Sequence, residues 1–283
     1  TSNLGNPNYK AFRDNSTSTH AIVVNGDAYG NDFSPYYYAD GYWSSYHISN
    51  SGYYFPHSSD YNLGSGEFTV EFWMNANDLV ANQYICGQVG SGGQGSDTAI
   101  QIYISNADGR LTLYLSGGGA SIETPAASIS ANTWHFVSCV RQSNTLRIYV
   151  DGVQKQSGSY SGTVLDSAGG FGIGQTGEYV GGGFKGFLSN LRLVVGSCLR
   201  DDGTTFSVPT TPLTSTGAET KILTAQSNRF IDNSPTGRTA TLSNTPKIST
   251  NTPFTVTKTA NVGSGFFDGT GDELEITNSS DFA

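Results

Sequence analysis

The chain has 283 residues, enough for one large or two ordinary domains with a buried core. Charged residues make up only 13%, whereas Gly numbers 36, Tyr 16 and Phe 15, a composition that favours sheets with polar loops over helices. The net charge of −9 and 14 scattered Lys and Arg argue against a nucleic-acid partner, and no apolar stretch approaches the ~20 residues of a membrane-spanning helix.

The first distinctive segment is rich in aromatic residues within a polar stretch. Tyr and Trp rings stack on sugar faces and also anchor protein interfaces. The segment predicts an intersubunit or intermodule contact, with core packing and a glycan platform as the alternatives. The glycan alternative predicts that Trp43→Ala abolishes glycan binding. The residues concerned are Tyr36, Tyr37, Tyr38, Tyr42, Trp43, Tyr46, Tyr53 and Tyr54.

The middle of the chain alternates apolar and polar residues with the period of a strand. The alternation runs through residues 68–73 and 100–104, and it resumes over 111–115 after a turn at 106–109. This arrangement predicts a strand followed by a β-hairpin. In the hairpin, the positions between the apolar residues are held by Gln101, Tyr103, Thr112 and Tyr114.

A second hairpin is predicted over residues 134–140 and 146–150, with Asp151-Gly152 starting the next turn. Two more strands follow, near residues 171–174 and 187–195. Turn residues recur about every ten positions, and no window keeps a helical period. Many short antiparallel strands at this spacing predict a β-sandwich or barrel.

An internal repeat relates the two ends of the chain. Residues 12–16 (FRDNS) recur as 230–234 (FIDNS), and 58–61 (SSDY) recur as 279–282 (SSDF), so the offset drifts from 218 to 221 residues. The second copy is either a truncated module or a segment that completes a sheet of a neighbouring subunit by strand exchange. The predicted organisation is a module over residues 1–205, a Pro/Thr/Ser linker over 206–220 and a partial second module over 221–283.

Four motifs resemble strands of laminin-G-like, concanavalin A-type jelly rolls. They are an opening strand at 66–73, a Trp-His-x-Val strand at 132–141, a Tyr-Val-Asp-Gly hairpin at 146–152 and a closing strand at 184–193. The resemblance implies an all-β, antiparallel two-sheet jelly-roll sandwich, followed by the start of a second similar module.

A further resemblance concerns the function. Residues 40–44, 228–234 and 267–272 resemble repeats in virion structural proteins of marine cyanophages, which also occur in bacterial surface proteins. It implies a structural or adhesive role at a virion or cell surface. The partners would be other copies of the chain or other virion or surface proteins. The alternatives are a carbohydrate-binding module of a secreted bacterial protein, with cell-surface glycans as partners, and a subunit of an extracellular filament.

Because enzymes also occur on this fold, catalytic residues need to be considered. Laminarinase-type jelly rolls carry Glu-x-Asp-x-Glu on one strand. Here Glu67 and Glu71 have no acid between them at position 69, and residues 272–275 have the wrong spacing. The sequence therefore predicts no catalytic residue and no enzyme. Alginate-lyase-like jelly rolls need a set of His, Tyr, Arg and Gln side chains on one sheet. Residues of three of these types occur here, and they are better explained by sheet packing: His135, Arg141, Arg147 and Tyr149.

Calcium is the ion that the resemblance implies, since laminin-G-like modules hold it with Asp and backbone carbonyl oxygens. The candidate ligands are Asp232, Asp268 and Asp272 in the second copy of the repeat and Asp14 in the first. The alternative interpretation is that Asp14 and Asn15 cap a loop.

Three cysteines lack CxxC spacing, and two of them, Cys86 and Cys139, lie within apolar strand patterns. We therefore predict buried free thiols rather than a disulfide for these two. Folding in a reducing cytosol is the simpler assumption, whereas the place of action implied by the resemblance is a virion or the cell exterior. The third cysteine is Cys198.

Overall fold

The computed structural model describes residues 12, 16–25, 29–31, 41–80, 82–90, 97–115, 119–178, 181–200, 203–254, 264–266, 271 and 273–276. The chain divides into two compact units. The larger comprises residues 39–255, and the smaller combines residues 1–38 with residues 256–283.

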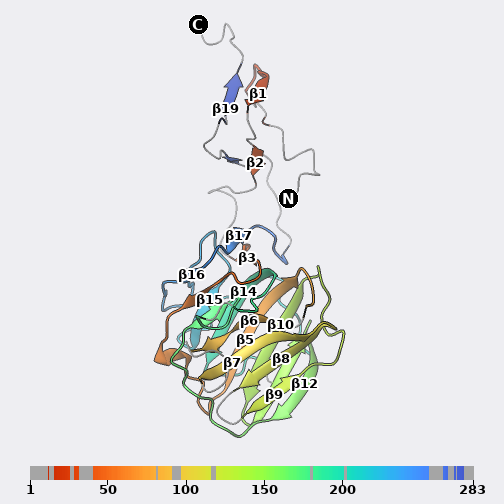
Figure 1. Cartoon of the computed structure of the whole chain (residues 1–283), viewed down its shortest axis with the longest axis vertical. Coiled ribbons are helices and arrows are strands. Elements are labelled where there is room, and N and C mark those ends of the chain that lie inside the picture. Colours follow the sequence, from red (N-terminus) through yellow and green to blue (C-terminus); the bar gives the residue numbers. More distant parts are fainter. Residues whose placement is uncertain are drawn as a thin grey trace. The chain divides into compact units, whose positions relative to one another are not determined.

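The larger unit contains two antiparallel sheets (Figure 1). The first has eight strands in the order β12-β11-β10-β5-β14-β3-β17, with β15 also paired to β14. Its strands are β3 (Ser44–His47), β5 (Phe68–Ala76), β10 (His135–Gln142), β11 (Thr145–Val150), β12 (Val153–Ser159), β14 (Gly186–Val195), β15 (Thr220–Thr224) and β17 (Lys247–Ser249).

The second sheet has seven strands in the order β16-β4-β13-β6-β7-β8-β9. They are β4 (Gly52–Phe55), β6 (Gln83–Val89), β7 (Thr98–Asn106), β8 (Arg110–Leu115), β9 (Ala120–Glu123), β13 (Phe171–Ile173) and β16 (Thr241–Ser243). A 3-10 helix, η2 (Ser59–Tyr61), follows β4. The prediction of an all-β, antiparallel jelly-roll sandwich is confirmed.

The core lies between the inner faces of the two sheets. Every second residue of β5, from Phe68 to Met74, is fully buried there, and Ile100, Ile102 and Ile104 of β7 face them from the other sheet. Burying side chains of this size stabilises the fold by roughly 1.5–3 kcal/mol each. The alternation of apolar and polar residues along the chain therefore decides which face of each strand is internal.

A smaller apolar cluster covers part of the outer face of the eight-stranded sheet. Phe136, Leu213 and Leu223 are buried in it, and Trp73 and Phe206 pack against them. Trp73 alternates with core residues of β5, so its side chain leaves β5 on the opposite face. The segment that follows β14 thus covers an outer sheet face that would otherwise be apolar and exposed.

The segment after the predicted linker belongs to the same two sheets. β15 pairs with β14, β16 with β4, and β17 with β3. The repeated motif also joins the core, since the rings of Phe230 and Tyr53 have centroids 4.9 Å apart. The structure divides the chain near residues 38 and 255 rather than at the predicted linker. Within this chain, residues 220–254 complete the sandwich, and a truncated or strand-exchanged second module stays a prediction.

The smaller unit contains two pairs of antiparallel strands. β1 (Ile22–Asn25) pairs with β19 (Glu273–Ile276), and β2 (Tyr29–Asn31) pairs with β18 (Ser264–Phe266). Each pair joins a strand from the beginning of the sequence to one from its end. On β19 both faces are exposed, including the apolar side chains of Leu274 and Ile276.

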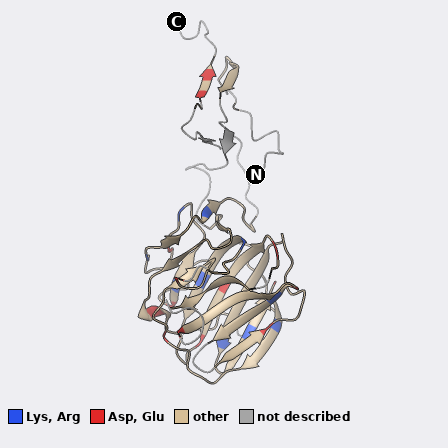
Figure 2. Cartoon of the chain, viewed as in Figure 1, with Lys and Arg blue, Asp and Glu red and all other residues tan. Residues whose placement is uncertain are grey.

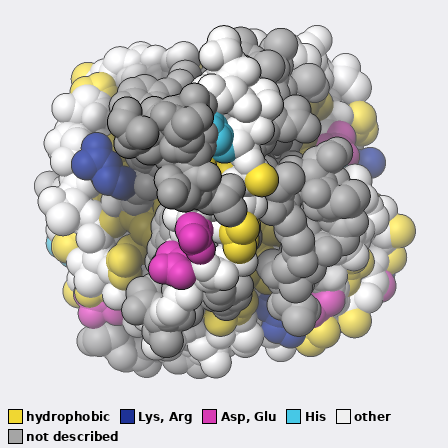
Figure 3. All heavy atoms as spheres, turned by 90° about the horizontal axis from the view of Figure 1, so that it is seen from above, with side chains coloured by type: hydrophobic (Ala, Val, Ile, Leu, Met, Phe, Trp, Pro, Cys, Tyr) yellow, Lys and Arg dark blue, Asp and Glu magenta, His cyan; other side chains and the backbone are white. Residues whose placement is uncertain are grey.

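Charged residues are sparse and dispersed. Figure 2 shows long stretches of both sheets without a charged residue. On the face seen in Figure 3, acidic and basic side chains lie in small separate groups. On this face, the described Lys and Arg side chains do not form a continuous basic stripe. Among the described residues, no helix has the length and apolar character needed to cross a membrane.

The cysteines Cys86 and Cys139 are buried free thiols, as predicted, and Cys198 is half-buried and not part of a disulfide among the described residues. Burial raises the pKa of the Cys86 and Cys139 thiols. Both therefore remain protonated and behave as small apolar core residues.

Candidate functional site

The structure distributes the predicted aromatic residues over different environments. Trp43 is 1% exposed and Tyr53 is fully buried, with its hydroxyl 3.2 Å from Thr224 Oγ1. Burial raises the pKa of Tyr53, so it stays a neutral hydrogen-bonding group inside the core. Tyr54, the next residue of β4, points to the outside of the seven-stranded sheet. Tyr36, Tyr37 and Tyr38 lie outside the described residues.

Two of the predicted residues lie on the outer side of the eight-stranded sheet. The Tyr46 ring lies against Phe187, with centroids 4.7 Å apart, and the centroid of the Trp134 ring lies 6.4 Å from that of Phe187. These three half-buried side chains, Tyr46, Phe187 and Trp134, form what we call the aromatic triplet. Tyr42 makes an edge contact with Phe254 at 5.9 Å.

This dispersal follows from the strand period. Neighbouring residues of a strand point to opposite faces, so a run of aromatic residues on one strand cannot form one surface. In β3, Ser45 and His47 point inward while Tyr46 points outward. The eight residues of the sequence prediction are therefore not brought together into one site in the part of the chain that the structure describes.

A more coherent group of aromatic side chains lies on the outer face of the seven-stranded sheet. Tyr84 of β6 is paired in register with Tyr103 of β7, and their ring centroids are 5.4 Å apart. Tyr114 lies on the neighbouring strand β8, on the same face, and interacts electrostatically with Tyr103. All three rings are half-buried. We call these three residues the tyrosine surface.

The side-chain amide of Gln101 lies beside the tyrosine surface. Gln101 pairs in register with Tyr114 on one side and with Gly87 on the other. Its side chain is only 4% exposed, and its Nε2 has no hydrogen-bond partner among the described residues. A buried donor that is left unpaired costs about 1–3 kcal/mol, so its persistence in a native structure needs an explanation.

A glycine-rich loop adjoins this row of residues. Gly172 pairs with Gly87 in register, and Tyr54 pairs with Gly172 from the next strand. The backbone N–H of Gly177 donates to the Gly87 carbonyl at 2.9 Å, and a Cβ on Gly172 would lie 2.5 Å from Gly177 N. Only glycine at position 172 lets the loop approach the sheet so closely. The loop thereby covers Gly172 next to Gly87, which pairs with Gln101.

The opposite border of the tyrosine surface is polar. Glu123 of β9 accepts hydrogen bonds from Ser105 Oγ at 2.6 Å and Thr112 Oγ1 at 3.2 Å, and Arg110 Nη1 lies 3.3 Å from it. Burial raises the pKa of Tyr103, and the nearby Glu123 charge adds to this rise. Tyr103 therefore remains a neutral phenol that can donate a hydrogen bond.

Asp232, the predicted calcium ligand that the structure describes, is engaged by the protein itself. Its Oδ1 accepts the backbone N–H groups of Leu223 and Ser234 at 3.0 and 2.9 Å. Its Oδ2 accepts the Ser234 hydroxyl at 2.8 Å and the Arg238 N–H at 3.1 Å. This carboxylate does not fit a calcium site, because it stabilises the loop after β15. Asp14, Asp268 and Asp272 lie outside the described residues, where calcium stays a prediction.

The acids considered for catalysis have structural partners. Both oxygens of the fully buried Glu71 form ion pairs, with Arg192 and Arg200. The carboxylate of Glu67 accepts the backbone N–H groups of Ser143 and Cys198. Neither carboxylate is thus available to protonate or attack a sugar.

His135 has two neighbours that resemble a Ser-His-Asp triad. Its Nδ1 lies 2.7 Å from Asp151 Oδ2, and its Nε2 lies 3.0 Å from Ser130 Oγ. The Ser130 backbone N–H also donates to Nε2, which occupies the lone pair that a general base needs. Burial opposes ionisation of Asp151, but hydrogen bonds from His135 and Phe136 N lower its pKa overall. The group stabilises the hairpin rather than activating a nucleophile.

Other residues weighed for a lyase are also structural. Arg141 is buried and donates to the carbonyls of Ser143 and Gly64 at 3.0 and 3.2 Å. The hydroxyl of the buried Tyr149 donates to the Gly203 carbonyl at 2.8 Å. These contacts agree with the sheet-packing interpretation.

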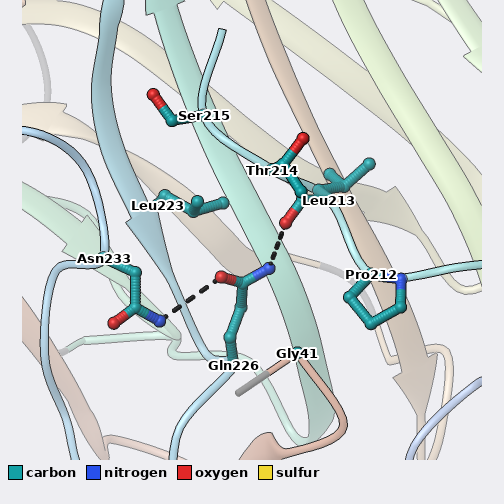
Figure 4. Close-up of a pocket in the computed structure, with 8 residues that line it drawn as sticks. All are labelled: Gly41, Pro212, Leu213, Thr214, Ser215, Leu223, Gln226 and Asn233. Carbon is teal, nitrogen blue, oxygen red and sulfur yellow. Dashed lines mark hydrogen bonds between the residues drawn. The ribbon is translucent and has the colours of Figure 1, made fainter. Parts of the chain in front are cut away.

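A shallow pocket of 410 Å³ lies beside β14 and β15 (Figure 4). Its amide groups bond one another, since Asn233 Nδ2 donates to Gln226 Oε1 at 3.3 Å and Gln226 Nε2 donates to the Leu213 carbonyl at 2.7 Å. The lining holds no aromatic ring against which a sugar could stack. The pocket residues are Gly41, Pro212, Leu213, Thr214, Ser215, Leu223, Gln226 and Asn233.

The tyrosine surface was not predicted from the sequence, although a signal for it exists. Gln101, Tyr103 and Tyr114 occupy the outward positions of the predicted 100–115 hairpin. Pairing the two strands in register about the turn would have placed them on one face.

Comparisons with known proteins agree with the architecture. The family model for the concanavalin A-like lectin/glucanases superfamily matches residues 49–198. Among solved structures, a Bacteroides ovatus protein thought to bind carbohydrate is 17% identical, with a TM-score of 0.51 over 75% of this chain. The alignment spans 60% of the length of that protein. No curated protein sequence matches the chain.

Two bacterial carbohydrate-binding domains are similar at a lower level. The CBM40 domain of the Ruminococcus gnavus IT-sialidase, bound to α2,3-sialyllactose, is 15% identical with a TM-score of 0.45, covering 59% of this chain and 97% of that one. Domain 4 of a Geobacillus stearothermophilus arabinanase, in complex with arabinotriose, is 17% identical with a TM-score of 0.43, covering 64% and 84%. At these identities the similarity concerns the fold alone.

Proposed function

The chain belongs to the concanavalin A-like lectin/glucanases superfamily, and from this premise we propose that it is a non-enzymatic adhesive protein that binds carbohydrate on its tyrosine surface. The place of action is a virion or the outside of a cell. The partners are surface glycans, together with other copies of the chain or other surface proteins.

The observation that carries the proposal is the unpaired Gln101 amide beside Tyr103 and Tyr114. Sugar rings present apolar C–H faces and a rim of hydroxyls. The tyrosine rings offer flat apolar area for the faces, and their hydroxyls offer polar contacts for the rim. A sugar hydroxyl at Gln101 Nε2 would supply the missing acceptor and remove the cost of the unpaired donor.

The roles of the acids support a binding function over hydrolysis. Glycoside hydrolysis requires two carboxyl groups that flank the scissile bond. At the tyrosine surface, Glu123 is held by Arg110 and by hydroxyl donors, which fix its position. We infer that Glu123 accepts hydrogen bonds from sugar hydroxyls.

The aromatic triplet is the alternative location for a glycan. Trp134 offers a larger ring, and its Nε1 lies 3.4 Å from Asn251 Oδ1. Its indole donor is thus already engaged. A buried donor without a partner among the described residues does lie on this face, Trp73 Nε1, but it belongs to a ring packed against Phe136 and Phe254. This difference favours the tyrosine surface.

A glycan array probed with the purified chain tests the proposal. We expect Tyr103→Ala to weaken binding to the best glycan at least tenfold, which corresponds to about 1.4 kcal/mol. Tyr103→Phe should retain most of the binding, because the ring remains. Trp134→Ala is the matched control, since it removes a half-buried aromatic residue from the opposite sheet and should leave binding unchanged.

The same array distinguishes the possible failures. Loss of binding with Trp134→Ala and not with Tyr103→Ala would move the site to the aromatic triplet. The absence of any glycan bound by the folded chain would contradict carbohydrate binding itself. Release of shortened sugars during incubation with a bound glycan would contradict the non-enzymatic assignment.

A further inference from the structure

The internal repeat reappears in the strand pairing. In the larger unit, β16 pairs with β4 so that Thr241 is opposite Tyr54. In the smaller unit, β1 pairs with β19 so that Val23 is opposite Glu275. Val23 and Thr241 are 218 positions apart and Tyr54 and Glu275 are 221 apart, the two limits of the repeat offset. The same repeat positions therefore face each other in both units.

The neighbouring strand pair follows the same rule. β17 pairs with β3 so that Lys247 is opposite Tyr46, and β2 pairs with β18 so that Tyr29 is opposite Phe266. The offsets are 218 positions from Tyr29 to Lys247 and 220 from Tyr46 to Phe266. Two independent strand pairs thus keep one register across the repeat.

In every case the pairing joins the start of one repeat copy to a later part of the other copy. β16 and β17 open the second copy, yet they complete the sheets to which β3 and β4 of the first copy belong. β1 and β2 open the first copy, and they pair with β18 and β19 of the second. The boundaries of the structural module therefore differ from those of the sequence repeat. The strands that complete its two sheets come from the next repeat copy.

The two units differ in what covers these strands. Tyr53 and Phe55 of β4 are fully buried in the core. Their repeat equivalents on β19 are Leu274 and Ile276, which are 37% and 44% exposed. The intervening Glu275 corresponds to Tyr54, which faces outward in β4. β19 thus alternates apolar and polar residues like a strand that packs on a core, but its apolar side chains are exposed.

We propose that β18 and β19 are the opening strands for another jelly-roll core of this family, with β1 and β2 as matching closing strands. The partner is the inner face of a sandwich like that formed here by β5, β7, β10 and β14. It would bury Leu274 and Ile276 as the present core buries Tyr53 and Phe55. Successive modules would then be joined by strands of one repeat copy that complete the sheets of the adjacent module, and not by linkers alone.

Extension of the chain tests this proposal. Residues 63–240 are added directly after Ala283, because the repeat aligns Phe282 with Tyr61. The added segment stops before β16 and β17, so β1 and β2 must serve as its closing strands. We expect the added segment to fold, which doubles the amplitude of the cooperative unfolding signal. Backbone amides of residues 273–276 should exchange with solvent deuterium at least 100-fold more slowly than in the 283-residue chain. The first module serves as an internal reference.

The double variant Leu274→Asp/Ile276→Asp provides the control. In the extended chain it should prevent folding of the added module and leave the first module intact. The proposal is overturned if the added module folds equally well with this variant, stays unfolded with the natural residues, or leaves the amides of 273–276 unprotected. It is also overturned if the 283-residue chain alone dimerises and protects those amides, since a second copy would then cover β19.

Discussion

Glu71 of β5 and Arg192 of β14 are paired in register, and their side chains form an ion pair that is almost completely shielded from solvent. The second carboxylate oxygen of Glu71 lies 3.0 Å from Arg200 Nη2. Arg192 also donates to the Thr214 carbonyl at 2.5 Å. One buried carboxylate therefore holds together two adjacent strands and the segment that covers the outer sheet face.

Replacement of Glu71 should destabilise the protein strongly. Glu71→Ala leaves two arginines without their shared carboxylate, and loss of one partner of a buried ion pair costs about 3–5 kcal/mol. Urea unfolding at neutral pH measures the effect. Glu178→Ala, which removes an exposed carboxylate, should change stability by less than about 0.5 kcal/mol. Equal effects of the two substitutions would contradict a structural role for the ion pair.

Stability should depend on pH through His47. Burial lowers the pKa of His47 to about 4 from its ordinary value of 6.5, so the ring is neutral when folded. Between these values the unfolded chain binds the proton and the folded chain does not. The stabilisation is complete above pH 6.5 and is lost as the pH falls towards 4, with a maximum of about 3 kcal/mol.

Urea unfolding of the His47→Gln variant between pH 7.5 and 4 tests this dependence. The variant should lack the His47 component of the pH slope. The exposed His57→Gln is the control and should keep the slope of the natural protein. An unchanged slope in His47→Gln would show that another group is responsible.

Trp43→Ala should lower stability rather than glycan binding. Trp43 is among the largest fully buried side chains, and truncation of such a residue costs about 3–5 kcal/mol. Thermal unfolding measures the loss, and array binding well below the midpoint shows whether the folded fraction still binds. Loss of glycan binding without loss of stability would restore the glycan-platform interpretation of this residue.

Asp232→Ala should destabilise the loop after β15 regardless of calcium. The substitution removes an acceptor shared by three backbone N–H groups and one hydroxyl. We expect a loss of about 1–3 kcal/mol that is the same in the presence of calcium and of a chelator. A calcium-dependent rise in melting temperature that Asp232→Ala abolishes would show that Asp232 is a ligand after all.

Two truncations test which segment completes the sandwich. A chain that ends at Gly217 lacks β15, β16 and β17, which exposes edges of both sheets and one side of Tyr53. It should fail to unfold cooperatively. A chain that ends at Thr255 keeps these strands and should melt close to the natural protein. Similar melting temperatures for both would show that residues 220–254 are not part of the module.

The sequence alone determined the parts of the fold that depend on local patterns. The hairpin over β7 and β8 was predictable because its two alternating strands flank one short turn. The pairing of β16 with β4 was not, although the repeat was visible. Alternation specifies which face of a strand is buried and carries no information about which strand lies beside it. The Thr241–Tyr54 contact joins residues far apart in the chain.

The site was predictable to a smaller extent for a related reason. Composition identified the aromatic segment that extends into β4, but Tyr53 and Tyr54 are successive residues of one strand and point in opposite directions. The tyrosine surface combines side chains from β6, β7 and β8. Its formation depends on the register between strands, which residue types alone do not reveal.

The pairing of β3 with β17 determines how the larger unit would respond to pulling. Ser44, the first residue of β3, is opposite Ser249, the last residue of β17. The chain therefore enters and leaves this strand pair at the same end. Tension between the flanking segments would load the Tyr42–Phe254 contact, then the Ser44–Ser249 contact, and would then open the pair in sequence towards Lys247 and Tyr46. Strands unzipped one bond at a time yield at low force and re-form readily. Opening of this strand pair would lengthen the chain under a sudden force while most strands of the two sheets stay paired.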